Sequence, residues 1–162
     1  MPERNGTDDE IEQLAQAVAA EAGRRGLRIG AAESLTSGAI AVALGKADDA
    51  SEWFAGSIVA YEASVKFELL GVAPGPVVTA RAAEQMATGA RERLGADAAV
   101  AVTWVGGPGE EEGRPAGTVY VAVALDGEAH IGEHHFDGDP AEVVAATVRA
   151  ALAALLHRLR EG

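Results

Sequence analysis

Short apolar runs alternate with segments of helical periodicity along this chain of 162 residues, and that alternation limits the folds open to it. Apolar and β-branched residues indicate strands at 27–32, 56–61, 98–103, 118–125 and 129–136. Apolar residues at helical spacing, with capping and stop residues nearby, predict helices at 8–22, 36–44, 63–70, 80–94 and from Pro140 onward. Helices that alternate with mostly buried strands indicate an α/β fold, a three-layer α/β/α sandwich around a mixed sheet.

The expected strands at 118–125 and 129–136 are joined by Asp126 and Gly127, the strongest hairpin signal in the chain. We therefore expect these two strands to run antiparallel. One domain is expected over residues 1–162, because a single core usually spans roughly 100–200 residues and no internal repeat or interdomain linker is visible. A short polar arm at residues 1–7 precedes the first helix.

The core must be built from small side chains. Hydrophobic residues make up 48% of the chain but aromatic residues only 4%, so alanine, valine and leucine have to fill the interior. Small side chains of this kind permit close packing of helices on a sheet.

Charge and composition exclude several classes of function. The 13 Lys and Arg against 25 Asp and Glu give a net charge of -12, which opposes binding to nucleic acids and anionic membranes. Without cysteine the chain has no disulfide, no thiolate nucleophile and no zinc–thiolate site. The N-terminus lacks a signal-peptide core and no apolar run reaches about 18 residues, so we expect a cytoplasmic location. The apolar Ala, Val and Leu faces also lead us to expect a homo-oligomer.

Ser34 lies in the turn between an expected strand and an expected helix, and this turn is the first candidate site. In open α/β sheets, ligands gather at the carboxyl ends of strands, and the free amides of a helix N-terminus attract phosphate or carboxylate groups. The alternative is that Ser34, Thr36 and Ser37 only cap the helix.

Tyr61 ends the second expected strand and Lys66 lies in the helix that follows, a spacing that could bring phenol and amine into one cleft. A desolvated lysine can activate a serine hydroxyl, in a variant of the catalytic triad, and a tyrosine can relay or donate a proton. The alternative makes Tyr61 an aromatic residue at a strand end and Lys66 a solvated surface charge.

Two other patterns favour no site. The loop at 106–109 is rich in glycine but is followed by acidic residues instead of the Gly-Lys-Ser/Thr of a nucleoside triphosphate site. His134 and His135 are adjacent on an expected strand and so point to opposite faces, which argues against a shared metal ion. We expect no metal site.

Several motifs in a fixed order are shared with one known family. They are AAESLTSG at 31–38, GSIVAYEASVKFELLGV at 56–72, VTARAAEQMATGARERLGAD at 78–97, AVTWVGGPG at 101–109 and GTVYVAVA at 117–124. Together they span most of the chain, which resembles the C-terminal domain of the CinA family, also known as the nicotinamide mononucleotide deamidase family.

The resemblance implies a mixed, mostly parallel five-stranded sheet and an amidohydrolase. Its reaction would convert nicotinamide mononucleotide to nicotinic acid mononucleotide and ammonia, without metal or cofactor. Ser34 would be the nucleophile, and Tyr61 and Lys66 would move protons. The residues implied to line or bind the substrate are Glu33, Thr36, Ser37, Gly38, Thr103, Gly107 and Thr118.

The chain departs from the family pattern in and around the implied site. Leu35 and Ser37 replace a cysteine and a glycine, and Trp104 stands where glycine is usual. Pro140 and Val144 stand where arginines are usual near the last helix. These departures leave a second hypothesis open, a nucleotide-binding or interaction module that keeps the scaffold without catalysis. A role with nucleic acid, suggested by the family's association with competence, is disfavoured by the acidic charge.

Overall fold

The computed structural model describes residues 6–104, 113 and 115–161 of the chain. Six helices and five strands follow one another in these residues. In chain order they are α1 (Gly6–Arg25), β1 (Ile29–Glu33), α2 (Ala39–Gly45), α3 (Ala50–Trp53), β2 (Phe54–Val59), α4 (Ala63–Leu70), α5 (Ala80–Leu94), β3 (Ala98–Trp104), β4 (Thr118–Leu125), β5 (Glu128–His135) and α6 (Pro140–Glu161).

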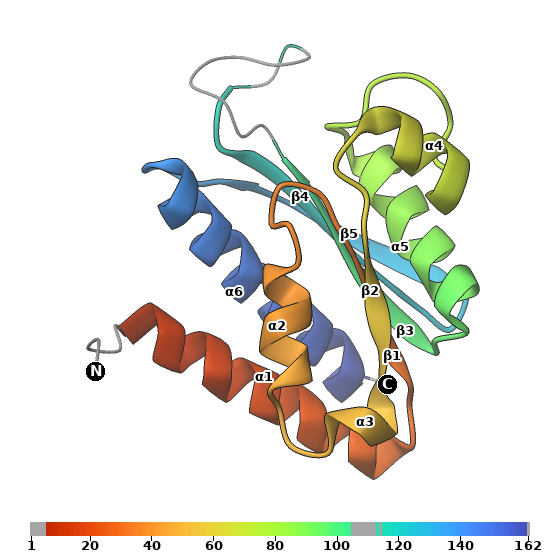
Figure 1. Cartoon of the computed structure of the whole chain (residues 1–162), viewed down its shortest axis with the longest axis vertical. Helices are drawn as coiled ribbons and strands as arrows, with labels where there is room; N and C mark the ends of the chain where they lie inside the picture. Colours follow the sequence, from red (N-terminus) through yellow and green to blue (C-terminus); the bar gives the residue numbers. More distant parts are fainter. Residues whose placement is uncertain (1–5, 105–112, 114, 162) are drawn as a thin grey trace.

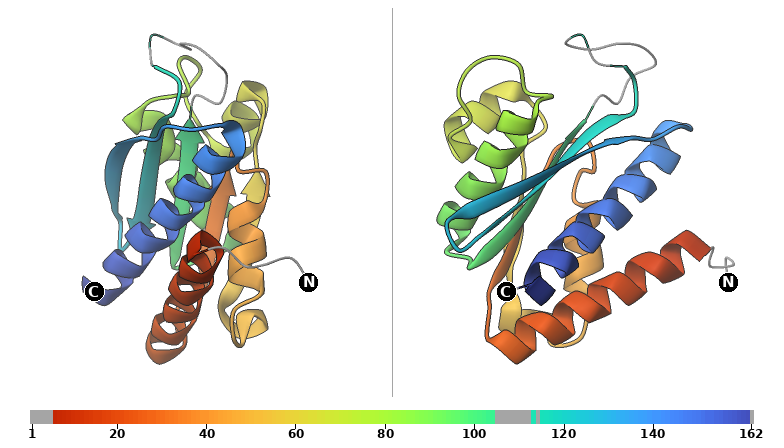
Figure 2. Two further views of the ribbon diagram at one scale, coloured as in Figure 1. Left: turned by 90° about the vertical axis from the view of Figure 1, so that its left-hand side faces the viewer. Right: turned by 180° about the vertical axis from the view of Figure 1, so that it is seen from behind.

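The five strands form one mixed sheet in the order β2-β1-β3-β4-β5. β1 runs parallel to both β2 and β3, whereas β4 is antiparallel to β3 and to β5. Four strands therefore share one direction and β4 opposes them. Helices α4 and α5 cover one face of the sheet, and α1, α2 and α6 cover the other (Figures 1 and 2). The α/β sandwich with a mixed sheet is thus confirmed.

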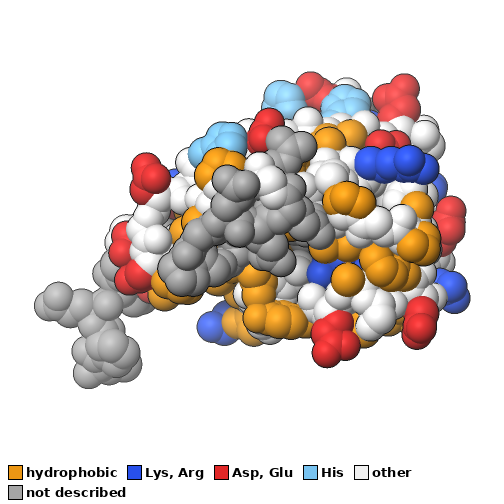
Figure 3. Space-filling model, turned by 90° about the horizontal axis from the view of Figure 1, so that it is seen from above, with side chains coloured by type: hydrophobic (Ala, Val, Ile, Leu, Met, Phe, Trp, Pro, Cys, Tyr) orange, Lys and Arg blue, Asp and Glu red, His pale blue; other side chains and the backbone are white. Residues whose placement is uncertain are grey.

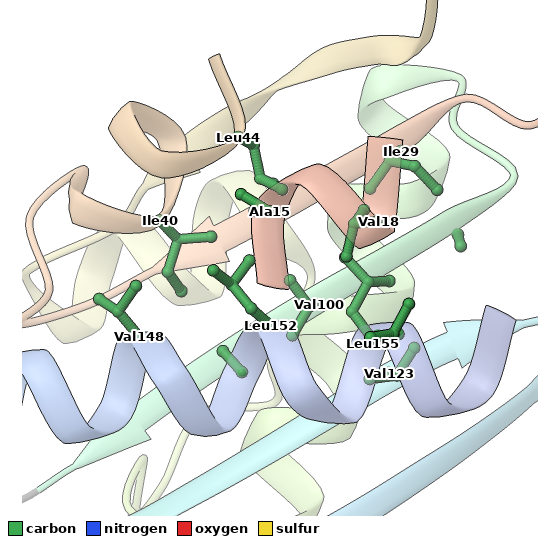
Figure 4. Packing of buried hydrophobic residues seen from close by; sticks show 14 of the residues in the cluster. Ala15, Val18, Ile29, Ile40, Leu44, Val100, Val123, Val148, Leu152 and Leu155 are labelled. Atoms are coloured by element: carbon green, nitrogen blue, oxygen red, sulfur yellow. The ribbon is translucent and has the colours of Figure 1, made fainter. Parts of the chain in front are cut away.

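The larger core lies between the sheet and the layer of α1, α2 and α6. Figure 4 shows Val148, Leu152 and Leu155 of α6 directed toward α1, α2 and the sheet. By length and composition, α6 is the one helix in the described part of the chain that could cross a membrane. Its apolar side is a core face, however, because Leu152 and Leu155 are fully buried against the rest of the domain.

The opposite face shows the close packing that a core of small residues allows. Alanines of α5 pack on alanines of β1, β3 and β4, and few large side chains intervene. At Gly89 of α5, an added Cβ would overlap the carbonyl oxygen of Leu70 at the end of α4. α5 therefore approaches α4 at a distance that only glycine permits.

The expected elements are present with shifted ends. α1 already includes Gly6 and Thr7, which the sequence pattern assigns to the polar arm. α2 begins at Ala39, so residues 36–38 form a turn and are not helical. The short helix α3 is an element that the sequence pattern does not predict. The hairpin at Asp126 and Gly127 joins β4 to β5 as expected.

Candidate active site

The carboxyl ends of β1, β2 and β3 and the amino end of β4 meet at one edge of the sheet, at the top of Figure 1. Ser34 follows β1, Tyr61 lies just after β2, and Thr103 and Thr118 lie at the facing ends of β3 and β4. The described candidate residues therefore share this edge; Gly107 lies outside the described residues. Figure 3 looks onto this end, where hydrophobic side chains gather and acidic side chains lie toward the rim.

Glu33, the last residue of β1, is fully buried and holds the start of α2. Its Oε1 accepts hydrogen bonds from the amides of Gly38 (3.2 Å) and Ile40 (2.8 Å). Its Oε2 accepts from the amide of Ala41 (3.1 Å) and from the Ser57 hydroxyl (2.8 Å). Four donors compensate the charge that burial would otherwise make costly.

This carboxylate corrects the expectation of an open anion site at the start of α2. Glu33 occupies three of the amides, and the Ala39 amide donates to the carbonyl oxygen of Thr36 at 2.9 Å. The protein's own carboxylate thus stands where the sequence pattern allows a phosphate. Since the oxygens of Glu33 are engaged, the residue shapes the turn above it.

The turn between β1 and α2 carries Ser34, Thr36 and Ser37. Ser34 is 4% exposed, and its hydroxyl makes no hydrogen bond within the described residues. Thr36 is also 4% exposed, and its buried Oγ1 has no hydrogen-bond partner within residues 6–104, 113 and 115–161. Ser37 is exposed and adopts a φ of 53°, with its hydroxyl donating to the Leu35 carbonyl oxygen at 3.3 Å. Neither Ser34 nor Thr36 caps α2 with its side chain.

Lys66 lies in the eight-residue helix α4 and is buried, whereas most lysines are exposed to solvent. Its side chain is 2% exposed, and its Nζ donates a hydrogen bond to the main-chain carbonyl oxygen of Tyr61 at 3.0 Å. The alternative of a solvated surface charge is therefore wrong. The Tyr61 residue is 59% exposed, so its phenol is open to solvent while its carbonyl holds the amine.

One main-chain hydrogen bond ties the two candidate segments together. The amide of Ala60, which precedes Tyr61, donates to the carbonyl oxygen of Glu33 at 2.8 Å, directly before Ser34. Ser34 and Tyr61 thus extend from adjacent, hydrogen-bonded strand ends. The hydrogen bond established for the Lys66 amine goes to the Tyr61 carbonyl oxygen; in ligand-free structures, hydrogen bonds between groups that act together in catalysis are often long.

Thr103 and Thr118 are buried at the same edge and anchor neighbouring loops. Thr103 donates from Oγ1 to the carbonyl oxygen of Val77 at 3.0 Å. Thr118 donates to the carbonyl oxygen of Pro115 at 2.7 Å, and its hydroxyl lies 3.4 Å from Nδ1 of His135. Each hydroxyl keeps lone pairs that could accept a further bond.

Comparison with known proteins agrees with this architecture. The sequence model of the protein family described as the CinA C-terminal domain matches residues 11–159 of this chain. The chain belongs to the CinA C-terminal domain family. It is 39% identical over 157 residues to the protein YdeJ of Escherichia coli, covering 93% of this chain and 91% of that protein. It is 39% identical over 125 residues to a CinA-like protein of Rippkaea orientalis, covering 74% of this chain but only 30% of that longer protein.

Solved structures of CinA proteins share the fold over nearly the whole chain. A CinA-superfamily protein from Escherichia coli is 37% identical with a TM-score of 0.89, covering 97% of this chain and 94% of that one. The competence/damage inducible protein CihA from Agrobacterium tumefaciens is 34% identical with a TM-score of 0.87, covering 99% of each chain.

Trp104 is a candidate that sequence reasoning about this CinA domain does not include among the site residues. It ends β3 at the candidate edge and is 4% exposed, and its buried indole Nε1 has no hydrogen-bond partner in the described part of the chain. The sequence marks this position only as a departure from the family pattern, an indole in place of the usual glycine. Ser57 was also missed, because only the structure shows its bond to Glu33.

The histidines of β5 interact with their neighbours. The ring of His134 stacks on Phe136 with a centroid distance of 5.4 Å, and partial burial, followed by the charge of His135, lowers the pKa of His134. Nε2 of His135 lies 3.6 Å from a carboxylate oxygen of Glu133. Within the described ranges, no group of three or more His, Asp or Glu side chains is arranged to hold a metal ion.

A groove of about 790 Å³ lies elsewhere, between α1, α2 and α6. Its walls include Ile11, Val42 and Val144 and contain none of the proposed catalytic residues. A groove of this volume is large enough for a small-molecule ligand. The strand-end edge instead carries the buried polar residues Ser34 and Lys66, whereas the walls of the groove are mainly apolar.

Proposed function

We propose that this CinA domain is an amidohydrolase that converts nicotinamide mononucleotide to nicotinic acid mononucleotide and ammonia. The observation that carries the proposal is a buried amine and an unbonded serine hydroxyl that come from two hydrogen-bonded segments at one end of the sheet. These groups are Lys66, with its Nζ fixed to the Tyr61 carbonyl oxygen, and Ser34. Membership of the CinA family adds support, because both residues lie within the matched range 11–159 and in the motifs that carry the resemblance.

In this proposal the Ser34 oxygen attacks the carbon of the substrate's carboxamide. The serine proton passes to the amine of Lys66, the C–N bond breaks, and the nitrogen leaves as ammonia after receiving a proton. Desolvation favours the neutral form of an amine, which is the form that accepts a proton. Water then hydrolyses the serine ester, which releases the acid and restores the hydroxyl. The exposed phenol of Tyr61 is suited to relay protons to solvent.

The test is ammonia release from nicotinamide mononucleotide by the purified chain. Ser34→Ala should abolish it while circular dichroism shows an unchanged fold. Ser51→Ala is the matched control, because Ser51 is exposed on α3 at the opposite end of β2. A wild-type chain that releases no ammonia would count decisively against the proposal.

One observation favours a second candidate, a binding module without turnover. The amides at the start of α2 are occupied by Glu33, so this CinA domain lacks one ready means of holding a phosphate. Such a module would be stabilised thermally by nicotinamide mononucleotide without releasing ammonia, because a ligand that prefers the folded state raises its apparent stability.

A further inference from the structure

Two buried polar atoms at the candidate edge have no hydrogen-bond partner among the residues that the structure describes. They are Nε1 of Trp104 and Oγ1 of Thr36, each in a residue that is 4% exposed. The only other such side-chain atom in the described ranges is Nε of Arg158, whose Nη2 donates to the Leu125 carbonyl oxygen at the far end of β4. A buried donor without a partner destabilises a fold, so two such groups at one edge call for an explanation.

The two residues extend from adjacent parallel strands. Trp104 is the last residue of β3, and Thr36 lies in the turn that leads from β1 into α2. Trp104 belongs to the core cluster that also contains Ile40 of α2 and Val148 of α6. The Trp104 side chain therefore lies on the side of the sheet that α2 covers, and Thr36 lies at the same strand-end edge, in the turn that leads into α2.

The chemistry of these atoms defines the group they could bind. An indole N–H only donates a hydrogen bond, whereas a threonine hydroxyl both donates and accepts. A ligand oxygen with free lone pairs would satisfy the indole, and a ligand hydroxyl would satisfy both groups.

The negative charge of Glu33 indicates that the bound group is uncharged. The buried carboxylate of Glu33 accepts from Gly38, only two residues beyond Thr36, so a negative charge is fixed beneath this turn. A phosphate placed here would meet that charge and would lack the free amides of α2.

We propose that Trp104 and Thr36 form a subsite for an uncharged oxygen of the substrate, a carbonyl or a sugar hydroxyl. This inference rests on the proposed function and deepens it, because it assigns this edge to the uncharged part of the mononucleotide. It also gives the indole at position 104 a role in specificity, as a donor that a glycine could not supply.

Binding can be measured separately from turnover. The chain has two tryptophans, and in a Trp53→Phe variant Trp104 is the only indole left. Titration of that variant with nicotinamide mononucleotide, nicotinamide riboside and free nicotinamide should change its tryptophan emission. The riboside lacks the phosphate but keeps the carboxamide and the ribose hydroxyls, so it should still bind to this subsite. Free nicotinamide tests whether the carboxamide oxygen or a ribose hydroxyl is the group recognised.

Trp104→Phe and Thr36→Val should then each weaken binding of the riboside, measured by calorimetry, by several-fold up to about tenfold, the loss of one hydrogen bond. Thr36→Ser should restore it. The matched controls are Trp53→Phe and Thr147→Val, whose polar atoms already bond to the carbonyl oxygens of Asp48 and Val143, and they should leave the dissociation constant unchanged.

The outcomes separate this inference from the proposed reaction. Weaker binding by Trp104→Phe without ammonia release from the wild type would support the subsite and refute the catalysis. Ammonia release with an unchanged KM in both Trp104→Phe and Thr36→Val would do the reverse. The inference is also overturned if no probe binds. It is likewise overturned if Trp104→Phe lowers the stability of the domain but leaves ligand binding unchanged, the result expected if a buried water, and not the substrate, bonds to the indole. Should Trp104→Phe fail to fold, Thr36→Val and Thr36→Ser carry the test.

Discussion

The amine of Lys66 is held 3.0 Å from the main-chain carbonyl oxygen of Tyr61, while the Tyr61 side chain faces solvent. Tyr61 thus supplies two separate groups. Its main-chain carbonyl positions the amine of Lys66, and its phenol takes no part in that hydrogen bond. This separation allows the amine and the phenol to be tested independently by substitution.

Lys66→Met removes the amine and retains an unbranched side chain of similar length. We expect kcat for ammonia release to fall about a hundredfold or more, the usual contribution of a positioned proton acceptor. Lys46→Met is the matched control, since Lys46 is the only other lysine and is exposed. Equal kcat values for Lys66→Met and wild type would remove Lys66 from the mechanism.

Tyr61→Phe removes the phenol and keeps the carbonyl that anchors Lys66. Because the side chain is exposed, the free energy of unfolding should change by no more than about 0.5 kcal/mol. A fall in kcat with unchanged stability would assign proton transfer to the phenol. If kcat also stays the same, the role of Tyr61 is limited to its carbonyl.

The burial of Lys66 shows where prediction from sequence stops. In α4 the apolar pattern includes Leu69 and Leu70, yet Leu69 is 43% exposed while Lys66 and Leu70 share the buried face, four residues apart. The pattern of a helix this short does not fix which side faces inward; contact with α5 decides it.

The strands and the hairpin were predictable because their signals are local. Asp126 and Gly127 both adopt positive φ, 55° and 77°, as a tight hairpin turn requires.

The role of Glu33 was not predictable in the same way, because its carboxylate bonds to amides of α2 and to Ser57 of another strand. The short helix α3 lacks the length that a periodic pattern needs. The single-domain extent, self-association and cytoplasmic location stay predictions.

Glu33→Gln should destabilise the fold and disturb the turn that carries Ser34. Glutamine carries an NH2 group where glutamate has its second carboxylate oxygen. This NH2 group can only donate, yet it would face the Ala41 amide and the Ser57 hydroxyl, which donate to that oxygen in the wild type. We expect the free energy of unfolding in urea to fall by about 1–3 kcal/mol. Glu62→Gln is the control, because Glu62 is exposed. Equal losses in the two variants would refute the proposed importance of the buried carboxylate.

Gly89→Ala tests the close approach of α5 to α4. The added methyl group would overlap the Leu70 carbonyl oxygen, and overpacking of this kind costs about 1–3 kcal/mol. The matched control is Gly23→Ala in α1, where an added Cβ meets nothing within 4 Å. There alanine should raise the melting temperature, since it favours a helix over glycine by about 0.5–1 kcal/mol. The two variants should therefore shift the melting temperature in opposite directions.

The stability of the domain should decrease in mild acid because of His134. Burial, and secondly the charge of His135, lowers the pKa of His134 below the ordinary 6.5. The unfolded chain therefore binds a proton at a higher pH than the folded chain, so stability is fully present above pH 6.5 and is lost as the pH falls through the folded pKa. His134→Gln should flatten the dependence of the urea midpoint on pH in this range, and His135→Gln should flatten it partly by removing the second cause. An unchanged slope in His134→Gln would show that other groups govern the acid sensitivity.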